Sequence, residues 1–315
     1  MNGTPSLPDR DLPPGRHRQL KEHLMHEIHK NPEPRGTSAD RKKWLLPAIG
    51  LPAAAGALAL ALALLISGAP GGTDAPGRGV GTEAGTEGTS PSATAVQLLD
   101  RVALAAVAQA PVEIRDDQYI YVSSLVQQHG GQPQDREVWE AVDGSRQGLL
   151  RTEGMGDVPL GGSSFNYRYL QTLPTDPEAM LEWLYGQQEE GDEDHDAHQD
   201  AYVHIGDLLQ ESLVPPDVAA ALYGAAALIP GVSVIPDAQD AAGRPGIAVS
   251  RTDSYNPDRS HELIFDEESL ELLGTRNVAL TDLDLEDSGP VAAGDVLYSS
   301  AVLDRAVVDE VGARP

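Results

Sequence analysis

The chain has 315 residues, of which 22 are Lys or Arg and 49 are Asp or Glu, so its formal net charge at pH 7 is −27. It contains no cysteine, which excludes disulfides, a cysteine-ligated zinc site and a lipoprotein anchor attached through cysteine. Because nucleic acids are bound through cationic side chains, so acidic a chain is not expected to bind them by electrostatics.

Residues 1–43 form a polar segment with nine Lys and Arg against six Asp and Glu, a net charge of +3. From Pro14 the stretch "PGRHRQLKEHLMHEIHK" predicts a short amphipathic helix. Its apolar face consists of Leu20, Leu24, Met25 and Ile28. A helix of about 15 residues is marginal alone in water. It therefore needs either a groove on a cytosolic partner or the inner leaflet of a membrane; disorder is the remaining alternative.

Residues 44–67 are predicted to form one transmembrane helix. The run "WLLPAIGLPAAAGALALALALLISG" carries no charged side chain, and as a helix it would be about 36 Å long, enough to cross a bilayer. A cleaved secretory signal is the first alternative, although 43 residues precede the run. A buried soluble helix is the second, although the run has no polar face. Arg41, Lys42 and Lys43 abut the run and predict a cytoplasmic N-terminus.

Residues 68–93 are dominated by Gly, Pro, Thr, Ser and Ala and lack the apolar residues needed for a core, so we expect a flexible linker. Beyond the predicted span, 13 cations face 43 anions, a net charge of −30. Residues 94–315 are long enough for one sizeable extracytoplasmic domain.

The first part of this domain combines a helix, antiparallel strands and a second helix. "ATAVQLLDRVALAAVAQAP" predicts a helix that ends at Pro111, with a stripe of Val96, Leu99, Val102, Ala103, Ala106 and Val107. "DQYIYVSSLVQQ", "EVWEAVD" and "RQGLLRTE" read as strands, the last two joined by a tight turn at "DGS". "PTDPEAMLEWLYGQQ" predicts a helix capped by Thr175 or Asp176, with Met180, Leu181 and Leu184 as its buried face.

A polar loop, "EEGDEDHDAHQD", precedes two further helices, "AYVHIGDLLQESL" and "PPDVAAALYGAAALIP". After Pro230 five alternating runs predict an antiparallel meander: "GVSVIPDAQ", "PGIAVSRTD", "SHELIFD", "LELLGTRNVALTD" and "DVLYSSAVLDRAVVDEV". The fold class is therefore α+β, with one transmembrane helix followed by an antiparallel, curved sheet packed against helices. The aromatic residues are expected in the core or half-buried in the sheet: Trp139, Trp183, Tyr119, Tyr121, Tyr167 and Tyr169.

No catalytic, cofactor-binding or metal-binding motif is complete. "HEIHK" at 26–30 and "HELIF" at 261–265 lack the second His of a metalloprotease helix, and "GGSSF" at 161–165 is no nucleophile elbow. His195 and His198 lie in an acidic loop, where weak binding of a divalent ion is the alternative to a solvated surface. The sequence thus predicts no catalytic residues, no cofactor and no metal.

Three stretches carry a resemblance: "DLPPGRHRQLKEHLMHEI" (Asp11 to Ile28), "SHELIFDEESLELLG" (Ser260 to Gly274) and "LYSSAVLDRAVVDEVGARP" (Leu297 to Pro315). They resemble an uncharacterised actinobacterial family of single-pass membrane proteins, often encoded beside extracytoplasmic-function sigma factors. The outer domain is loosely similar to lipoprotein-carrier and sigma-regulator domains, in which a half-barrel cradles a lipid or peptide. The chain departs from zinc-binding anti-sigma domains, because it has no Cys.

The resemblance implies a plasma-membrane protein of the cell envelope with a link to a sigma factor. We therefore expect a non-enzymatic sensor or regulator whose outer domain binds an apolar ligand or a protein and whose tail contacts a cytosolic sigma factor. The alternative is a membrane-tethered carrier-like module that binds a lipid or peptide, with the tail serving only topology. An unrecognised envelope enzyme stays open, because no residue pattern addresses it.

Overall fold

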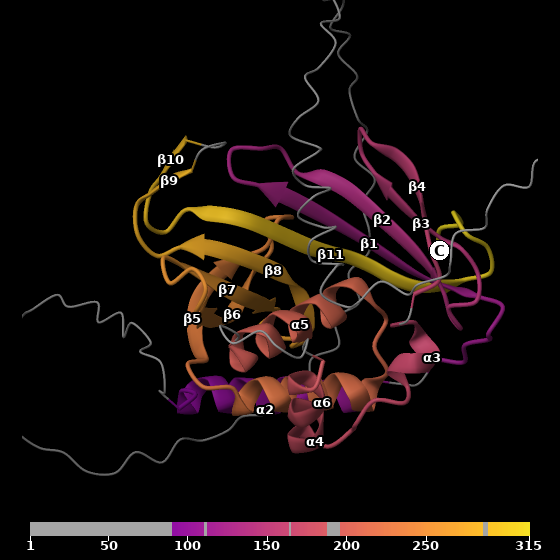
Figure 1. Cartoon of the computed structure of the whole chain (residues 1–315), viewed down its shortest axis with the longest axis horizontal. Helices are drawn as coiled ribbons and strands as arrows, with labels where there is room; N and C mark the ends of the chain where they lie inside the picture. Colours follow the sequence, from indigo (N-terminus) through magenta and orange to yellow (C-terminus); the bar gives the residue numbers. More distant parts are fainter. Residues whose placement is uncertain (1–89, 110–111, 164, 188–195, 286–288) are drawn as a thin grey trace, which may run out of the picture. The chain divides into compact units, whose positions relative to one another are not determined.

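The computed structural model describes residues 90–109, 112–163, 165–187, 196–285 and 289–315 (Figure 1). The predicted tail helix, the transmembrane span and residues 68–89 of the predicted linker lie outside these residues. The end of the predicted linker at residue 93 is wrong by a few residues, because Ser92 caps a helix that begins at Ala93. Among the described helices, none combines the length and apolar character that crossing a membrane requires. What the structure describes is an antiparallel sheet with helices on one face, which confirms the α+β class.

The main sheet has nine strands in the order β4-β3-β2-β1-β11-β8-β7-β6-β5, and β9 and β10 form a separate two-stranded sheet. The strands are β1 (Tyr119–Gln128), β2 (Gln134–Ala141), β3 (Gly148–Thr152), β4 (Gly156–Leu160), β5 (Ser233–Gln239), β6 (Pro245–Thr252), β7 (Arg259–Phe265), β8 (Leu272–Ala279), β9 (Leu283–Leu285), β10 (Gly289–Val291) and β11 (Val296–Val308).

The predicted meander is present as β5, β6, β7, β8 and β11, and β11 joins it to the N-terminal strands. It pairs with β1 from Tyr119 opposite Val308 to Gln128 opposite Tyr298, and with β8 on its other side. Both edge strands contain a proline, Pro159 in β4 and Pro236 in β5. Because proline cannot donate to a neighbouring strand, these edges resist pairing with other chains.

Most of the described helices begin at a side-chain cap, and the cap that the sequence predicts for one of them is present. The helix after Pro215 begins without one. Ser92 caps α2 (Ala93–Val107), and Asp176 caps α4 (Pro177–Tyr185), which has proline at its start. The others are α3 (Tyr167–Leu170), α5 (Ala197–Glu211) and α6 (Pro216–Leu228). In Figure 1, α2, α4, α5 and α6 lie together beside β5 to β8.

Two details of the predicted helices are wrong. α5 begins inside the expected polar loop, because the Asp196 side chain accepts the His198 N–H and caps a helix there. Val107, expected on the buried stripe of α2, is 51% exposed, because the helix ends at this residue. Met180 and Leu184 of α4 are buried as predicted, and Leu181 is partly buried.

The two faces of the sheet are covered differently. We call inner the face that carries Val249, Leu263 and Phe265, which join the buried residues of all the longer helices in one cluster. The outer face carries Tyr119, Tyr121 and Trp139, which alternate along their strands with inner residues. Tyr119, Tyr121 and Trp139 are buried, as predicted. Trp183, Tyr167 and Tyr169 are partly buried, but they lie in helices and not in the sheet.

Candidate functional site

Helix α5 lies across the inner face and is fastened to the sheet at both ends. At its N-terminal end, Arg251 of β6 donates to Asp196, with 3.0 Å between Nη2 and Oδ2, and to the buried amide oxygen of Gln199. The Tyr202 hydroxyl donates to the Val249 carbonyl oxygen at 2.7 Å. These bonds hold the first half of the helix against β6.

The middle of α5 approaches the sheet closely at Gly206. A Cβ atom at this position would lie 3.1 Å from Cδ2 of Leu263 on β7 and 4.0 Å from Cγ2 of Thr275 on β8. Glycine is therefore used here to let the helix backbone touch the sheet. One turn later, the amide oxygen of Gln210 accepts hydrogen bonds from Thr275 Oγ1 at 2.6 Å and from Ser300 Oγ at 2.7 Å.

The last turn of α5 is held by two arginines of the sheet. Arg305 of β11 donates through Nη2 to the Leu209 carbonyl oxygen at 2.5 Å, and Arg136 of β2 reaches Glu211, with 3.3 Å between Nη2 and Oε2. The last carbonyl groups of a helix lack partners within it, and a cation near this end is favourable. Removal of either arginine would loosen the end of the helix.

Glu140 is a carboxylate without a direct partner beside this helix end. It lies on the inner face of β2, four residues after Arg136 and one residue before Ala141, which ends the strand. The pKa of Glu140 is raised from 4.5 to about 7. Loss of hydration is the largest cause, repulsion by Glu211 adds to it, and Arg136 opposes both. In the part of the chain that the structure describes, no hydrogen bond or ion pair reaches its carboxylate.

We call Arg136, Glu140 and Glu211 the inner-face charge cluster, because the charges of Arg136 and Glu211 both act on Glu140. Arg305 contacts the same helix end through the Leu209 carbonyl. Burial lowers the pKa of Arg305, and its Nε has no hydrogen-bond partner within the described ranges. The end of α5 thus lies near a carboxylate and a guanidinium nitrogen that have no hydrogen-bond partner within the described residues.

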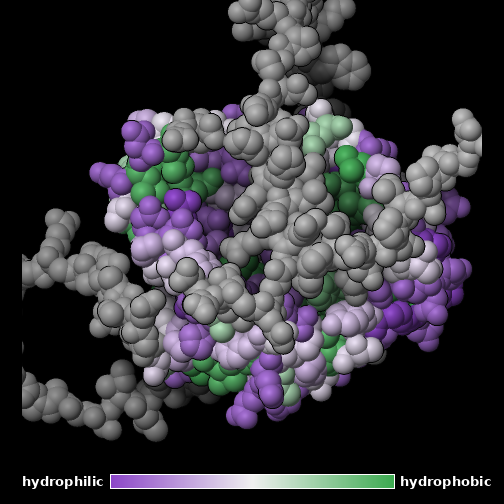
Figure 2. All heavy atoms as spheres, viewed as in Figure 1, coloured by the Kyte–Doolittle hydropathy of each residue, from purple (hydrophilic) through white to green (hydrophobic). Residues whose placement is uncertain are grey.

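Apolar side chains continue the inner face beyond the cluster. Val138, Leu150 and Val158 lie opposite one another on β2, β3 and β4, and Val158 is 37% exposed. Figure 2 shows hydrophobic surface in this region and a second area beside β9 and β10, where Leu280 is exposed and Leu283 and Leu285 are partly buried.

A cavity of about 220 Å³ lies where the β1–β2 turn approaches the β5–β6 turn. Its lining is mostly polar and includes Gln127, His129, Asp240, Arg276 and Ser299. It is therefore suited to a small polar molecule and not to the apolar ligand that the sequence suggested.

The sequence-predicted site residues divide between described and undescribed parts. Leu20, Leu24, Met25 and Ile28 of the tail face and Arg41, Lys42 and Lys43 at the predicted span lie outside the described residues, as does His195. The Nδ1 atom of His198 lies 2.8 Å from the Tyr185 hydroxyl. Among the described residues, no three His, Asp or Glu side chains are grouped as metal ligands would be.

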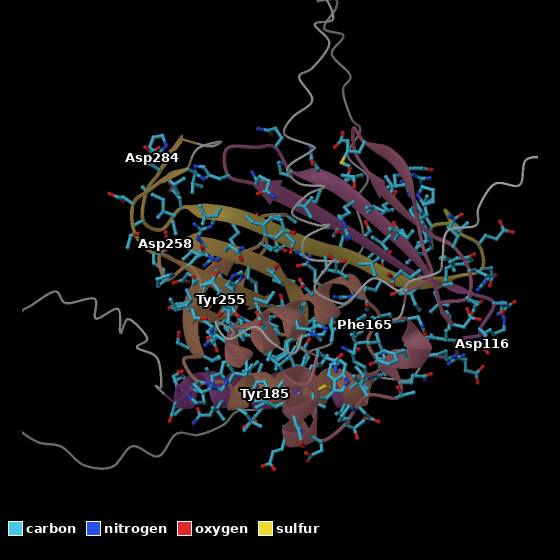
Figure 3. The ribbon with its side chains drawn as sticks, viewed as in Figure 1. Asp116, Phe165, Tyr185, Tyr255, Asp258 and Asp284 are labelled. Carbon is cyan, nitrogen blue, oxygen red and sulfur yellow. The ribbon has the colours of Figure 1, made fainter. Side chains whose placement is uncertain are left out.

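Arginine supplies all the positive charge of the outer domain, because the four lysines lie within residues 1–43. Many of these arginines are paired internally, as Arg168 is with Asp116 and Arg259 with Asp258. Figure 3 shows Asp116 at one end of the sheet and Asp258 and Asp284 at the other. The excess carboxylates leave the domain strongly acidic. No residue spacing in the sequence could have shown that Arg136, Glu140 and Glu211 meet, because the ion pair spans 75 residues.

No protein-family model matches the chain, and no curated protein matches it. Among solved structures, the chain is similar to MucB in the Pseudomonas aeruginosa MucA/MucB complex, with 16% identity and a TM-score of 0.27 over 71% of this chain and 59% of that one. A second MucB structure gives 15% identity and a TM-score of 0.27, with 71% and 61% covered. MucB in complex with MucA(peri) gives 14% and 0.24, with 70% and 57% covered. In each case the chain covers less than two thirds of the solved chain.

Proposed function

We propose that the chain is a single-pass protein of the plasma membrane with a cytoplasmic N-terminus and a non-enzymatic extracytoplasmic sensor domain. The proposal is supported by the uncharged run at 44–67, by Arg41, Lys42 and Lys43 before it, and by the charge difference between its two sides, +3 against −30. In this account the tail helix contacts a cytosolic regulator, and an extracytoplasmic-function sigma factor is the proposed partner.

The observation that carries the sensor proposal is the position of Glu140 beside the ion pair that ends α5. A sensor needs an element with two arrangements whose free energies differ by a few kcal/mol. Arg136 faces Glu211 in one arrangement, and an ionised Glu140 competes for the same guanidinium. A change of charge at Glu140 therefore alters how firmly the end of α5 is held.

A carrier-like module is the second candidate, and one observation favours it. Leu150 and Val158 continue the inner face past the end of α5 and are only partly covered. An acyl chain or an apolar peptide side chain would bury this surface. The lipid extract of the purified full chain, analysed by mass spectrometry, tests this candidate: a bound lipid supports it and a clean extract contradicts it.

The proposed link to a sigma factor is tested with the N-terminal tail. A tail peptide of residues 1–43 is expected to retain an extracytoplasmic-function sigma factor from a lysate of the source cells, and Leu24→Asp is expected to abolish retention. Gln19→Asp, which adds the same charge away from the apolar face, is the matched control. Absence of binding, together with an unchanged regulon after deletion of residues 1–43, would contradict the sigma-factor link.

A further inference from the structure

The last residues of the chain fold back onto the outer face of the sheet. After β11 the chain turns at Gly312, whose φ is +84°. Ala313 then packs against the buried outer cluster of Tyr119, Tyr121, Trp139, Ala141 and Val308. The segment Gly312–Pro315 thus lies over β1 and β2, on the side of the sheet opposite to α5.

Two side chains of β2 hold this segment. Arg314 donates through Nε to Glu137 Oε1 at 2.5 Å and through Nη2 to Oε2 at 2.7 Å, which is a two-point guanidinium–carboxylate contact. The indole N–H of Trp139 donates to the Ala313 carbonyl oxygen at 2.5 Å. One arginine side chain and the backbone carbonyl before it are therefore recognised together.

The sheet side of this contact also has contacts of its own that do not involve the segment. The Glu137 side chain is 9% exposed, accepts the Tyr121 hydroxyl at 2.7 Å and lies 3.7 Å from Arg151 Nη1. The Arg151 guanidinium stacks over the Trp139 ring at 5.0 Å, and the Tyr121 and Trp139 rings are 5.2 Å apart. We call Tyr121, Glu137, Trp139 and Arg151 the Trp139 groove.

The occupant, by contrast, lies at the surface. The Arg314 side chain is 64% exposed, while the carboxylate it contacts is 9% exposed. The hydrogen bond from Arg314 is the largest influence that lowers the pKa of Glu137. Removal of the segment would leave the Glu137 carboxylate with Arg151 at 3.7 Å as its nearest remaining cation, and that state favours a replacement cation of the same geometry.

We propose that the Trp139 groove is a recognition site for an extended, arginine-bearing peptide segment of a partner protein, and that residues 312–315 occupy it in cis. The Glu137 carboxylate accepts two hydrogen bonds from the guanidinium, and the Trp139 indole N–H donates to the carbonyl oxygen of the preceding residue. The net charge of −30 beyond the predicted span favours basic partners over acidic ones. A partner binds by displacing the resident segment.

The expected affinity of a free peptide depends on how strongly the resident segment competes for the groove. A tethered peptide competes at an effective concentration on the order of millimolar. A free peptide should therefore bind the wild-type chain weakly and bind a chain with a weakened resident segment at least about tenfold more tightly.

The test uses the full chain in detergent, a fluorescein-labelled peptide of sequence EVGARP and its variant EVGAQP, with binding read by fluorescence anisotropy. Arg314→Gln should raise the affinity for EVGARP at least about tenfold over wild type, and EVGAQP should not bind. Arg101→Gln removes an equal charge from the exposed surface of α2 and should leave the affinity unchanged. Equal affinities of the wild-type and Arg314→Gln chains, or equal binding of both peptides, would overturn the proposal.

Two further variants locate the peptide in the groove. Glu137→Gln in the Arg314→Gln background should abolish binding. Trp139→Phe, which keeps an aromatic ring but removes the N–H donor, should weaken binding several-fold. If Glu137→Gln does not fold, two other measurements show whether the peptide occupies the groove. One is the affinity of Trp139→Phe, and the other is the indole N–H resonance of Trp139 in the wild-type chain at millimolar peptide. If the chain formed a concentration-dependent dimer that Arg314→Gln abolished, the proposal of a partner protein would be wrong. The groove would then hold residues 312–315 of a second copy.

Discussion

Arg136 on β2 and Glu211 at the end of α5 form an ion pair across 75 positions of sequence, with 3.3 Å between Nη2 and Oε2. Their side chains are 20% and 37% exposed, so the pair is neither fully buried nor fully solvated. Glu140, four residues after Arg136, is a second carboxylate that is influenced by the charges of Arg136 and Glu211 without a direct contact. The proposed dependence of the end of α5 on charge rests on this neighbour.

Glu140→Gln is expected to stabilise the domain at pH 8 and to leave it unchanged at pH 4. The pKa of Glu140 is about 7 in the folded chain against 4.5 ordinarily. A raised carboxyl pKa means that folding retains the proton, so stability is full below about pH 4.5 and falls as pH rises to about 7. Because the group is partly hydrated, we expect a gain of about 2 kcal/mol at pH 8.

Urea unfolding of the full chain in detergent at the two pH values measures this gain. Glu153→Gln, at an exposed position in the turn after β3, is the matched control and should show no pH-dependent difference. An equal effect of Glu140→Gln at pH 4 and pH 8 would show that its charge does not matter.

Gly206→Val is expected to destabilise the domain by about 2 kcal/mol, because the new side chain meets Leu263 where α5 touches the sheet. Gly161→Val is the control, since a Cβ at that position meets nothing within 4 Å. Thermal unfolding followed by circular dichroism compares the two. If both variants melted alike, the close contact of α5 with β7 would be wrong.

Asp253→Asn is expected to lower the free energy of unfolding at pH 7 by about 2 kcal/mol. Burial raises the pKa of Asp253, but hydrogen bonds from His261, Asn256 and the Tyr255 N–H outweigh it and bring the pKa to about 2. A lowered carboxyl pKa stabilises the fold above about pH 4, and this stability is lost as pH falls toward 2.

Acid titration of unfolding checks this dependence. The difference between wild type and Asp253→Asn should shrink steadily below pH 4. Asp258→Asn, whose side chain is 37% exposed, should change little at any pH. A difference that stayed constant from pH 7 to pH 2 would contradict the assignment.

Periodicity in the sequence predicted most of the elements but not the way they meet. The five runs after Pro230 alternate cleanly and all form strands. β4 was missed because "GDVPL" has only five residues and contains Pro159, and β9 and β10 have three residues each. Segments this short contain too few alternating apolar and polar residues to be recognised as strands.

The inner-face charge cluster could not be predicted, because it depends on contacts between distant segments. Glu140 reads as an ordinary polar position between Trp139 and Ala141. Only the crossing of α5 over the sheet places Glu211 beside it. Likewise, Arg314 and Glu137 are 177 residues apart and gave no local signal. The tail residues Leu20, Leu24, Met25 and Ile28 stay a prediction.

The two-sided topology is tested most directly by cysteine labelling, since the chain has no cysteine of its own. Ser38→Cys introduces a thiol before the predicted span, and Gln147→Cys introduces one at an exposed position between β2 and β3. In intact spheroplasts, a membrane-impermeant maleimide should label Gln147→Cys at once and Ser38→Cys only after lysis. Equal labelling of both thiols before lysis, or recovery of the full chain in a salt-washed soluble fraction, would contradict the account.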